Sequence, residues 1–264
     1  MKKLGFIGCG NMGGALAKAA AKAECEIFLA DFDEKKAKTL AEETGGRVCD
    51  NNFVAKNCDY IFLGVKPQVL ASALADFAET LCERNDRFVL VSMAAGVTTE
   101  KISGMIGKPL PIIRIMPNTP VAVGGGMVLY TAANTTEAEV ECFLDIMAKA
   151  GRFDCLPEKL IDAASAVSGC GPAFVCQFLE ALADGGVACG LPRDKALLYA
   201  AATLEGTARL VLETGTHPAA LKDAVCSPGG STIEGVRRLE EGALRATVID
   251  AVIDSYERTK ELGK

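Results

Sequence analysis

The sequence predicts an α/β fold in which a doubly wound parallel sheet is followed by an all-α domain. Short apolar runs alternate with helical segments through the first half of the chain, as they do in parallel sheets. After about Leu156 these runs stop, and every later segment has a helical pattern. We therefore expect two domains, with the sheet in residues 1–157 and only helices in residues 158–264.

The predicted strands are short and mostly apolar. Tyr60–Val65 is an unbroken apolar run, as expected of a strand buried on both faces of a parallel sheet. The predicted strands are Leu4–Ile7, Glu26–Ala30, Tyr60–Val65, Phe88–Ser92, Ile112–Met116, Met127–Tyr130 and Arg152–Leu156. The predicted helices among them are Ala15–Ala23, Glu34–Glu43, Gln68–Leu81, Thr99–Ile106 and Glu137–Ala150.

The helices of the second half are unusually apolar. Ala196–Leu204, for example, is apolar nearly all round, and such a helix must be buried on every side. We expect an interlocked homodimer in which two chains share one helical core; the alternative is a monomer whose helices pack back on the sheet. The predicted helices are Lys159–Val167, Pro172–Cys189, Asp194–Glu213, Ala219–Val225, Thr232–Glu241 and Leu244–Leu262.

The composition argues against several classes of protein. Half of the residues are hydrophobic and the net charge is -6, whereas a protein that binds nucleic-acid phosphates is normally basic. No apolar run approaches the roughly 18–20 residues of a membrane span, and the first residues reach glycine too soon for a signal peptide. The 11 cysteines are scattered without a Cys-x-x-Cys pair, and His217 is the only histidine. We expect no metal site, no nucleic-acid or membrane partner, and reduced thiols in the cytoplasm.

A glycine-rich motif marks a candidate dinucleotide site. It follows the first predicted strand, opens a helix, and reads Gly8-Cys9-Gly10-Asn11-Met12-Gly13. In such a motif the first glycine permits a tight turn, the second lets the backbone approach a pyrophosphate, and the third lets helix and strand pack closely. The alternative is a glycine-rich turn without a ligand.

Asp31 ends the next strand, 23 residues after Gly8, close to the spacing of an acid that binds the adenosine ribose. A carboxylate there accepts hydrogen bonds from both ribose hydroxyls and repels a 2′-phosphate, which favours NADH over NADPH. Phe32 follows in place of a phosphate-binding arginine, although Lys35 and Lys36, one helical turn on, would offset the repulsion. Helix capping is the alternative role for Asp31, but Asp33 is better placed for it.

Three further strand ends are candidate walls of this site, because ligands of open α/β sheets bind outside the carboxyl ends of the strands. A lysine at such a strand end either binds a phosphate or carboxylate group or is simply exposed to solvent. Small residues would let a nicotinamide ring lie close to the backbone, and prolines would make the wall of the site rigid. The three segments are Val65-Lys66-Pro67, Met93-Ala94-Ala95-Gly96 and Met116-Pro117-Asn118-Thr119-Pro120.

Two glycine-rich segments punctuate the helical half, Ser168–Pro172 and Ser227–Thr232. Both are explained as ordinary helix starts, and Ser231 with Glu234 fits a capping box in which Ser231 is the N-cap. The functional interpretation is that the amides of Gly229, Gly230, Ser231 and Thr232 bind a small carboxylate at a helix N-terminus.

The candidate site lacks a strong acid or base. No lysine follows Gly171 in its helix, and His217, beside Pro218, is expected to cap a helix. A dehydrogenase of alcohols needs such a group to transfer the hydroxyl proton. A protonated imine, by contrast, needs only a hydride and correct positioning. The residues therefore favour reduction of a C=N bond.

Several of these segments, taken together, closely resemble the pyrroline-5-carboxylate reductase family over nearly the whole chain. They are Gly8–Gly13, Val65–Pro67, Met116–Pro120, Ser168–Ala173, Glu180–Gly186 and Leu221–Thr232, of which the Ser-Pro-Gly-Gly-x-Thr run is the most specific. The resemblance implies a Rossmann domain, a helical dimerisation domain, and dimers that commonly assemble to decamers. The implied reaction is hydride transfer from NAD(P)H to 1-pyrroline-5-carboxylate, which yields L-proline.

The resemblance also implies roles for individual residues. Backbone at Val225 and Gly229–Thr232 would hold the substrate carboxylate, and the Thr232 hydroxyl would contact the ring nitrogen. Cofactor contacts are implied at Gly8–Gly13, Asn51, Val65–Pro67 and Met93–Ala95. Many members carry Asn-Arg or Ser-x-x in place of Asp31-Phe32, and those often take NADPH.

Two other functions fit parts of the pattern. A β-hydroxyacid dehydrogenase shares a Rossmann domain followed by helices, but needs the lysine that is missing after Gly171. A dinucleotide-sensing regulator would bind the cofactor without turnover, although this chain has neither a basic charge nor a DNA-binding appendage.

Overall fold

The computed structural model describes residues 1–262, which form two compact units. The first unit comprises Met1–Cys170 together with the chain from Ser255 onward, and the second comprises Gly171–Asp254. Helix α13, Leu244–Leu262, has residues in both units.

The first unit is built on a sheet of eight strands within residues 1–262, in the order β3-β2-β1-β4-β5-β6-β7-β8. Strands β1 to β6 are parallel, which confirms the predicted doubly wound sheet. The last two strands run the other way, because β7 pairs antiparallel with β6 and β8 pairs parallel with β7. The strands are β1 Lys2–Ile7, β2 Cys25–Ala30, β3 Arg47–Val48, β4 Tyr60–Leu63, β5 Val89–Ser92, β6 Ile112–Met116, β7 Gly126–Ala133 and β8 Gly151–Cys155.

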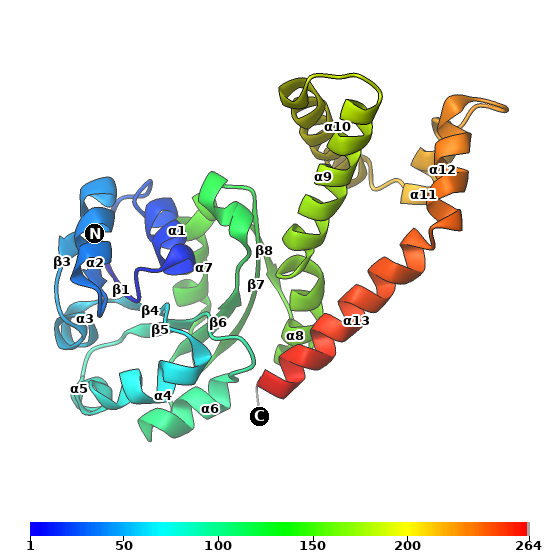
Figure 1. Cartoon of the computed structure of the whole chain (residues 1–264). Coiled ribbons are helices and arrows are strands. Elements are labelled where there is room, and N and C mark those ends of the chain that lie inside the picture. The colour runs from blue at the N-terminus through cyan, green and yellow to red at the C-terminus, as the bar shows by residue number, and fades with distance from the viewer. Residues whose placement is uncertain (263–264) are drawn as a thin grey trace. The chain divides into compact units, whose positions relative to one another are not determined.

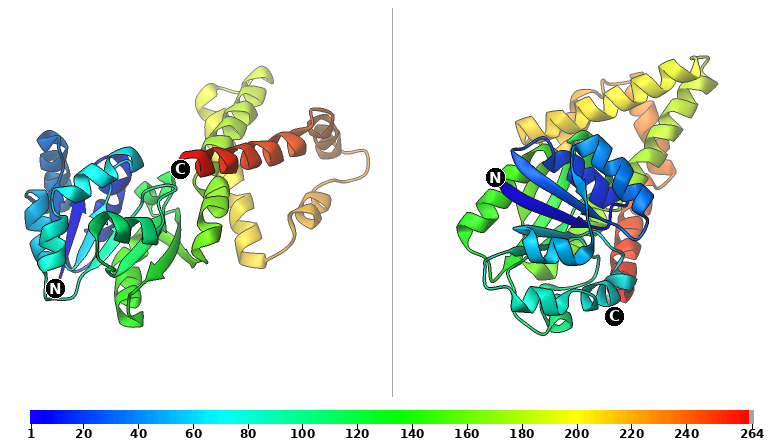
Figure 2. Two further views of the ribbon diagram at one scale, coloured as in Figure 1. Left: turned by 90° about the horizontal axis from the view of Figure 1, so that it is seen from below. Right: turned by 90° about the vertical axis from the view of Figure 1, so that its left-hand side faces the viewer.

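Helices cover both faces of the sheet (Figure 1, Figure 2) and bury two hydrophobic cores. One core packs α1, α2 and α7 against one face, and the other packs α3, α4, α5 and α6 against the opposite face. Along β6, Ile113 and Ile115 enter the first core while Ile112 enters the second, as the two-residue period of a strand requires. The helices are α1 Asn11–Ala20, α2 Glu34–Thr44, α3 Asn51–Asn57, α4 Pro67–Ala75, α5 Ala78–Glu83, α6 Thr99–Ile106 and α7 Glu137–Met147.

The structure corrects the predicted elements in three places. The single helix expected at Gln68–Leu81 is divided into α4 and α5 at Phe77, whose backbone is not helical and whose side chain is buried in the second core. Strand β3 and helix α3 were not predicted, although Asp50 caps α3 by accepting a hydrogen bond from the Phe53 N–H at 2.6 Å. Two 3-10 helices were also missed, Thr119–Val123 and Ala148–Ala150.

Helix α8, Glu158–Ser168, packs against β7 in the first unit. Its attachment includes Arg114 on β6, whose side chain is 1% exposed. The Arg114 guanidinium lies 2.6 Å from a carboxylate oxygen of Asp162 and 3.4 Å from one of Glu158. Glu158 in turn accepts hydrogen bonds from the backbone N–H and the hydroxyl of Thr99, at 2.8 and 2.9 Å.

The described residues of the second unit form helices and the loops between them, and include no strand. Its helices are α9 Gly171–Ala188, α10 Arg193–Thr214, α11 Pro218–Ala224, α12 Ser231–Glu241 and the first part of α13. Helices α9 and α10 pack on each other through a small core that includes Ala183, Ala196 and Ala200. His217 caps α11 as predicted, since its Nδ1 accepts a hydrogen bond from the Ala219 N–H at 3.2 Å.

Large apolar side chains of the second unit are exposed in the single chain. Leu197, Leu198 and Tyr199 on α10 are 42%, 57% and 53% exposed, although α10 is apolar nearly all round in this region. One chain therefore does not bury the surface that the sequence predicts to be buried.

One stretch, Glu158–Ala188, is long and apolar enough to cross a membrane by length and composition alone. This corrects the expectation that no stretch approaches that length. Isolated polar residues such as Gln177 and Glu180 keep each apolar run in this stretch short, but they lower its mean hydropathy only a little. The stretch comprises α8 and α9, of which α8 packs on the sheet as described.

Candidate active site

The glycine motif lies at the switch point of the sheet, where β1 pairs with β2 on one side and β4 on the other. Gly8 has φ +101°, and a Cβ on it would lie 2.7 Å from the backbone of Gly64, which follows β4. A Cβ on Gly13 would overlap the carbonyl oxygen of Gly8. These two glycines are therefore required by close backbone packing.

Gly10 differs from the other two, because a Cβ on it would have no heavy atom within 4 Å. Gly10 is the N-cap of α1, and no side chain within residues 1–262 caps this helix start. The backbone N–H groups of Asn11 and Met12 are therefore the first of a ten-residue helix, and they lie at an open surface. An open helix N-terminus with a glycine in front of it fits a pyrophosphate.

Asp31 is fixed against the glycine motif. One carboxylate oxygen accepts a hydrogen bond from the Cys9 N–H at 2.6 Å, and the other accepts one from the Asp33 N–H at 2.8 Å. Each oxygen keeps further acceptor capacity, so the carboxylate can still bind ribose hydroxyls. The predicted cap of α2 is confirmed, since Asp33 accepts from the Lys35 N–H at 3.1 Å.

The Cys9 side chain is buried under this loop and is not a nucleophile. Burial, with a smaller effect of the Asp31 charge, raises the pKa of the Cys9 thiol to about 12. Its sulfur lies 3.6 Å from the carbonyl oxygen of Ala30. Cys9 therefore stays a neutral thiol that supports the turn, and only its backbone is available to a ligand.

A cavity of about 550 Å³ adjoins the motif, between the start of α1 and helix α2. Cys9, Gly10 and Asn11 line it, as do three lysines, Lys18, Lys35 and Lys36. Lys18 is paired with Glu43 at 2.8 Å, and the Lys36 ammonium lies 4.0 Å from Asp33. Phe32, which follows Asp31, is fully exposed.

The remaining predicted cofactor residues follow parallel strands and so share the carboxyl edge of the sheet. Val65, Lys66 and Pro67 follow β4, and Lys66 is the exposed N-cap of α4. Met93, Ala94 and Ala95 follow β5, but the Ala94 side chain is 1% exposed and packs in the second core, which leaves its backbone for a ligand. Asn51 is the first residue of α3, beyond the end of β3.

The predicted substrate residues all lie in the second unit, around the start of α12. Val225 ends α11 and is 64% exposed. Gly229, with φ +69°, has open space where a Cβ would be, and the Gly230 N–H donates to the carbonyl of Ser227 at 3.0 Å. Ser231 and Thr232 are exposed in the first turn of α12.

The predicted capping box at this helix is wrong. Gly230 is the N-cap of α12, no side chain of the described residues caps it, and Ser231 is already helical. Glu234 instead pairs with Arg237 at 3.0 Å. The error arises because α12 begins one residue earlier than predicted: its N-cap is Gly230, and Ser231 is the first helical residue. The correction leaves the first N–H groups of α12 open, which suits the anion site that the sequence predicts.

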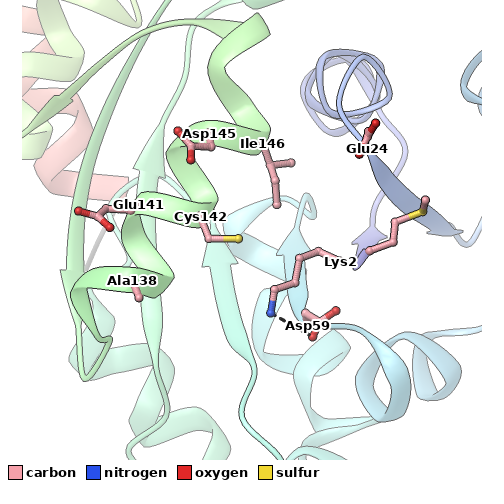
Figure 3. A pocket seen from close by; sticks show the side chains of 9 residues that line it. Lys2, Glu24, Asp59, Ala138, Glu141, Cys142, Asp145 and Ile146 are labelled. Carbon is pink, nitrogen blue, oxygen red and sulfur yellow. Dashed lines mark ion pairs between the residues drawn. The ribbon is translucent and has the colours of Figure 1, made fainter.

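Two cavities larger than the one beside the glycine motif lie elsewhere in the described residues. One of about 640 Å³ is lined by Lys2 at the start of β1, by Asp59 before β4, and by acidic side chains of α7 (Figure 3). It lies at the amino ends of the strands, away from the edge where ligands of such sheets bind. The other, about 620 Å³, is an apolar groove of the second unit that includes Phe174, Phe178 and Leu239. Among residues 1–262 no group of three or more His, Cys, Asp or Glu side chains is arranged to hold a metal ion.

Comparison with known proteins identifies the family. The model for the pyrroline-5-carboxylate reductase dimerisation domain matches residues 158–262, and a model described as NADP oxidoreductase coenzyme F420-dependent matches residues 3–96. A pyrroline-5-carboxylate reductase of Escherichia coli strain K12 is 40% identical, over 100% of this chain and 99% of that protein. This chain belongs to the pyrroline-5-carboxylate reductase family.

Relatives of this family occur in other kingdoms and among solved structures. A pyrroline-5-carboxylate reductase of Arabidopsis thaliana is 37% identical, over 99% of this chain and 96% of that protein. The crystal structure of Plasmodium falciparum pyrroline carboxylate reductase with NADP bound is 33% identical, with a TM-score of 0.89 over 100% of this chain and 98% of that chain. Full-length membership of the pyrroline-5-carboxylate reductase family leaves no support for the dehydrogenase and regulator alternatives.

Proposed function

We propose that this chain catalyses hydride transfer to the C=N bond of 1-pyrroline-5-carboxylate and so forms L-proline, the last step of proline synthesis. The observation that carries the proposal is the glycine loop at the switch point, with Gly10 open and Asp31 bonded to Cys9. This loop fits a nicotinamide dinucleotide, and the identity to named reductases over the full chain supports the substrate.

The residues of the first unit would hold the cofactor. Backbone N–H groups of Gly10–Gly13 would bind the pyrophosphate and Asp31 the ribose, with Asn51, Val65–Pro67 and Met93–Ala95 as the surrounding wall. When bound, the nicotinamide supplies the hydride for the imine carbon. The backbone of Ala94 and the small side chain of Ala95 leave the strand end accessible to a flat ring.

The residues of the second unit would hold the substrate. The open N–H groups of Gly229–Thr232, with backbone at Val225, would bind the carboxylate, and the Thr232 hydroxyl would contact the ring nitrogen. The imine carbon gains the hydride and the nitrogen gains a proton, which converts C=N to the secondary amine of proline. A protonated imine is already electrophilic, so positioning supplies much of the catalysis.

We propose NADH as the preferred cofactor. The Asp31 carboxylate is held 2.6 Å from the Cys9 N–H, where a second negative group, a 2′-phosphate, would be repelled. Lys35 and Lys36 beside the same cavity oppose this preference. Two of the comparisons also favour NADPH: the NADP in the Plasmodium falciparum structure, and the family model described as an NADP oxidoreductase.

We further propose a functional division at residues 1–157 and 158–264, a homodimer formed through the helical part, and assembly of dimers to a decamer. The match to a dimerisation domain and the exposed apolar groove of the second unit support the dimer. All 11 cysteines are free thiols, which supports a reducing, cytoplasmic location. Light scattering coupled to gel filtration distinguishes monomer, dimer and decamer.

The test is the loss of reduced-nicotinamide absorbance when purified protein is given pyrroline-5-carboxylate with NADH or, separately, NADPH. Faster loss with NADH supports both the reaction and the role of Asp31; faster loss with NADPH retains the reaction and refutes the cofactor preference. No loss with either, in folded protein that binds cofactor, refutes the reaction. Thr232→Val removes the hydroxyl and keeps the shape, so kcat/KM should fall about 10- to 100-fold, whereas Thr232→Ser should retain most activity.

A further inference from the structure

The side chain of Asn118 joins the loop after β6 to the start of β7 and to the end of α8. Its Nδ2 donates a hydrogen bond to the carbonyl oxygen of Ser168 at 2.9 Å. Its Oδ1 accepts one from the Met127 N–H, also at 2.9 Å. The residue is 8% exposed, so both ends of the amide are used inside the protein.

The position of these bonds relates Asn118 to the reaction. Asn118 follows β6 at the carboxyl edge of the sheet, where the cofactor residues lie. Ser168 is the last residue of α8, and its carbonyl is one of those that a helix leaves without an internal partner. The chain passes from the first unit to the second two residues later, after Cys170.

Strand β6 and the loop that follows it hold α8 at both ends. Arg114 pairs with Glu158 and Asp162 in the first two turns of α8, and Asn118 binds the carbonyl of Ser168 at its last residue. Because both attachments are buried or half-buried, α8 cannot slide along the strand without breaking them.

The connection from α8 to α9 has little slack. Only Gly169 and Cys170 separate α8 from Gly171, the first residue of α9. The N–H groups of Gly169 and Cys170 both donate to the carbonyl of Ser165, at 2.7 and 3.1 Å. The anchored carbonyl of Ser168 therefore determines where the chain leaves the sheet.

We propose that Asn118 is a positioning residue for hydride transfer: it fixes the end of α8 to the carboxyl edge of the sheet and so fixes the point at which the chain leaves the first unit. This inference rests on the function proposed above. Hydride transfer is sensitive to such geometry, since a displacement of about 1 Å can reduce the rate roughly 100-fold.

The test variant is Asn118→Asp. It keeps the oxygen that accepts from the Met127 N–H, but it has no N–H for Ser168, and its charge faces the Ser168 carbonyl. The matched control is Asn134→Gly. Asn134 donates from Nδ2 to the carbonyl of Leu110 at 3.3 Å, near the opposite end of β6, and its φ of 57° suits glycine.

For Asn118→Asp we expect kcat to fall about 10- to 100-fold while the dissociation constant for reduced cofactor, measured by fluorescence, stays within about twofold. The deuterium isotope effect with labelled cofactor should rise, because the chemical step becomes slower than product release. Amide hydrogen exchange should become faster at Gly169 and Cys170. Asn134→Gly should change none of these values.

Two results overturn the inference: an unchanged kcat in the folded variant, or a loss of cofactor affinity as large as the loss of kcat, which indicates general loosening. Wild-type protein without reductase activity refutes the proposed function instead. In that case hydrogen exchange still tests whether Asn118 holds the end of α8. Faster exchange at Gly169 and Cys170 in Asn118→Asp supports this attachment, and unchanged exchange overturns it. If Asn118→Asp does not fold, Asn118→Ser, which leaves room for a bridging water, is held to the same criteria.

Discussion

Gly10 offers a direct test of the cofactor loop, because a methyl group added there contacts no atom of the protein. The ideal Cβ position has no heavy atom within 4 Å, and the backbone angles, φ -70° and ψ -171°, are accessible to alanine. The free energy of unfolding of Gly10→Ala should therefore stay within about 0.5 kcal/mol of the wild-type value.

Cofactor affinity should respond very differently. The added methyl occupies the space through which a pyrophosphate would approach the first N–H groups of α1. If the misfit costs as much as overpacking in a protein core, about 1–3 kcal/mol, the affinity falls roughly 5- to 150-fold. Thermal unfolding without cofactor and fluorescence titration with NADH measure the two quantities separately.

Gly13→Ala is the contrasting variant. Its Cβ would overlap the carbonyl oxygen of Gly8, so both stability and affinity should fall, the former by about 1–3 kcal/mol. Wild-type affinity in Gly10→Ala would show that no pyrophosphate lies against Gly10 and would refute the assignment of this loop. An equal loss of stability in the two variants would refute the steric argument.

Three other predictions concern charged groups. Asp31→Asn keeps an acceptor for the Cys9 N–H but removes the charge, so the ratio of kcat/KM for NADPH to that for NADH should rise roughly fivefold or more in steady-state assays. Arg114→Met leaves the carboxylates of Glu158 and Asp162 without their partner. Because these carboxylates are part-exposed, the free energy of unfolding in urea should fall by about 3 kcal/mol, the lower end of the range for buried pairs. A fall of less than about 0.5 kcal/mol would contradict this prediction. The hydrogen bond from Arg87 lowers the pKa of Glu139 from 4.5, so this contribution to stability is present above that value and is lost as the pH falls through the lower, folded pKa. The difference in Tm between wild type and Arg87→Met should therefore be larger at about pH 7 than at about pH 3, and an equal difference would sink the argument.

The sequence predicts best what depends on local pattern. The buried strands from β1 to β6 are unbroken or nearly unbroken apolar runs, and most of their bounds agree within two residues; only β3 escaped prediction. β3 has just two residues, Arg47–Val48, which is too short for any periodicity, and its place at the edge of the sheet needs no apolar face. The reversal of β7 was also not predicted, because a strand's direction depends on its connection and not on its composition.

Contacts between distant residues could not be predicted in this way. Arg114 interrupts the apolar run of β6, and a buried charge implies a partner, but nothing local identifies Glu158 or Asp162, 44 and 48 residues away. Asn118 stood within a segment chosen as a wall of the site, yet its bond to Ser168 spans 50 residues. The placement of the predicted cofactor residues at one edge of the sheet followed from topology. The contacts of the predicted cofactor and substrate residues with their ligands remain predictions.

The two edges of the sheet bear on how this chain behaves before it assembles. An open edge exposes unpaired backbone groups on which another strand can grow, and an eight-stranded sheet has two such edges. Here one edge is the two-residue β3, and the other, β8, carries the exposed charges Arg152 and Asp154. Both edges are thus poor templates for strand addition, so a freshly synthesised chain can expose the apolar helices of its second unit while its sheet resists aggregation through strand pairing.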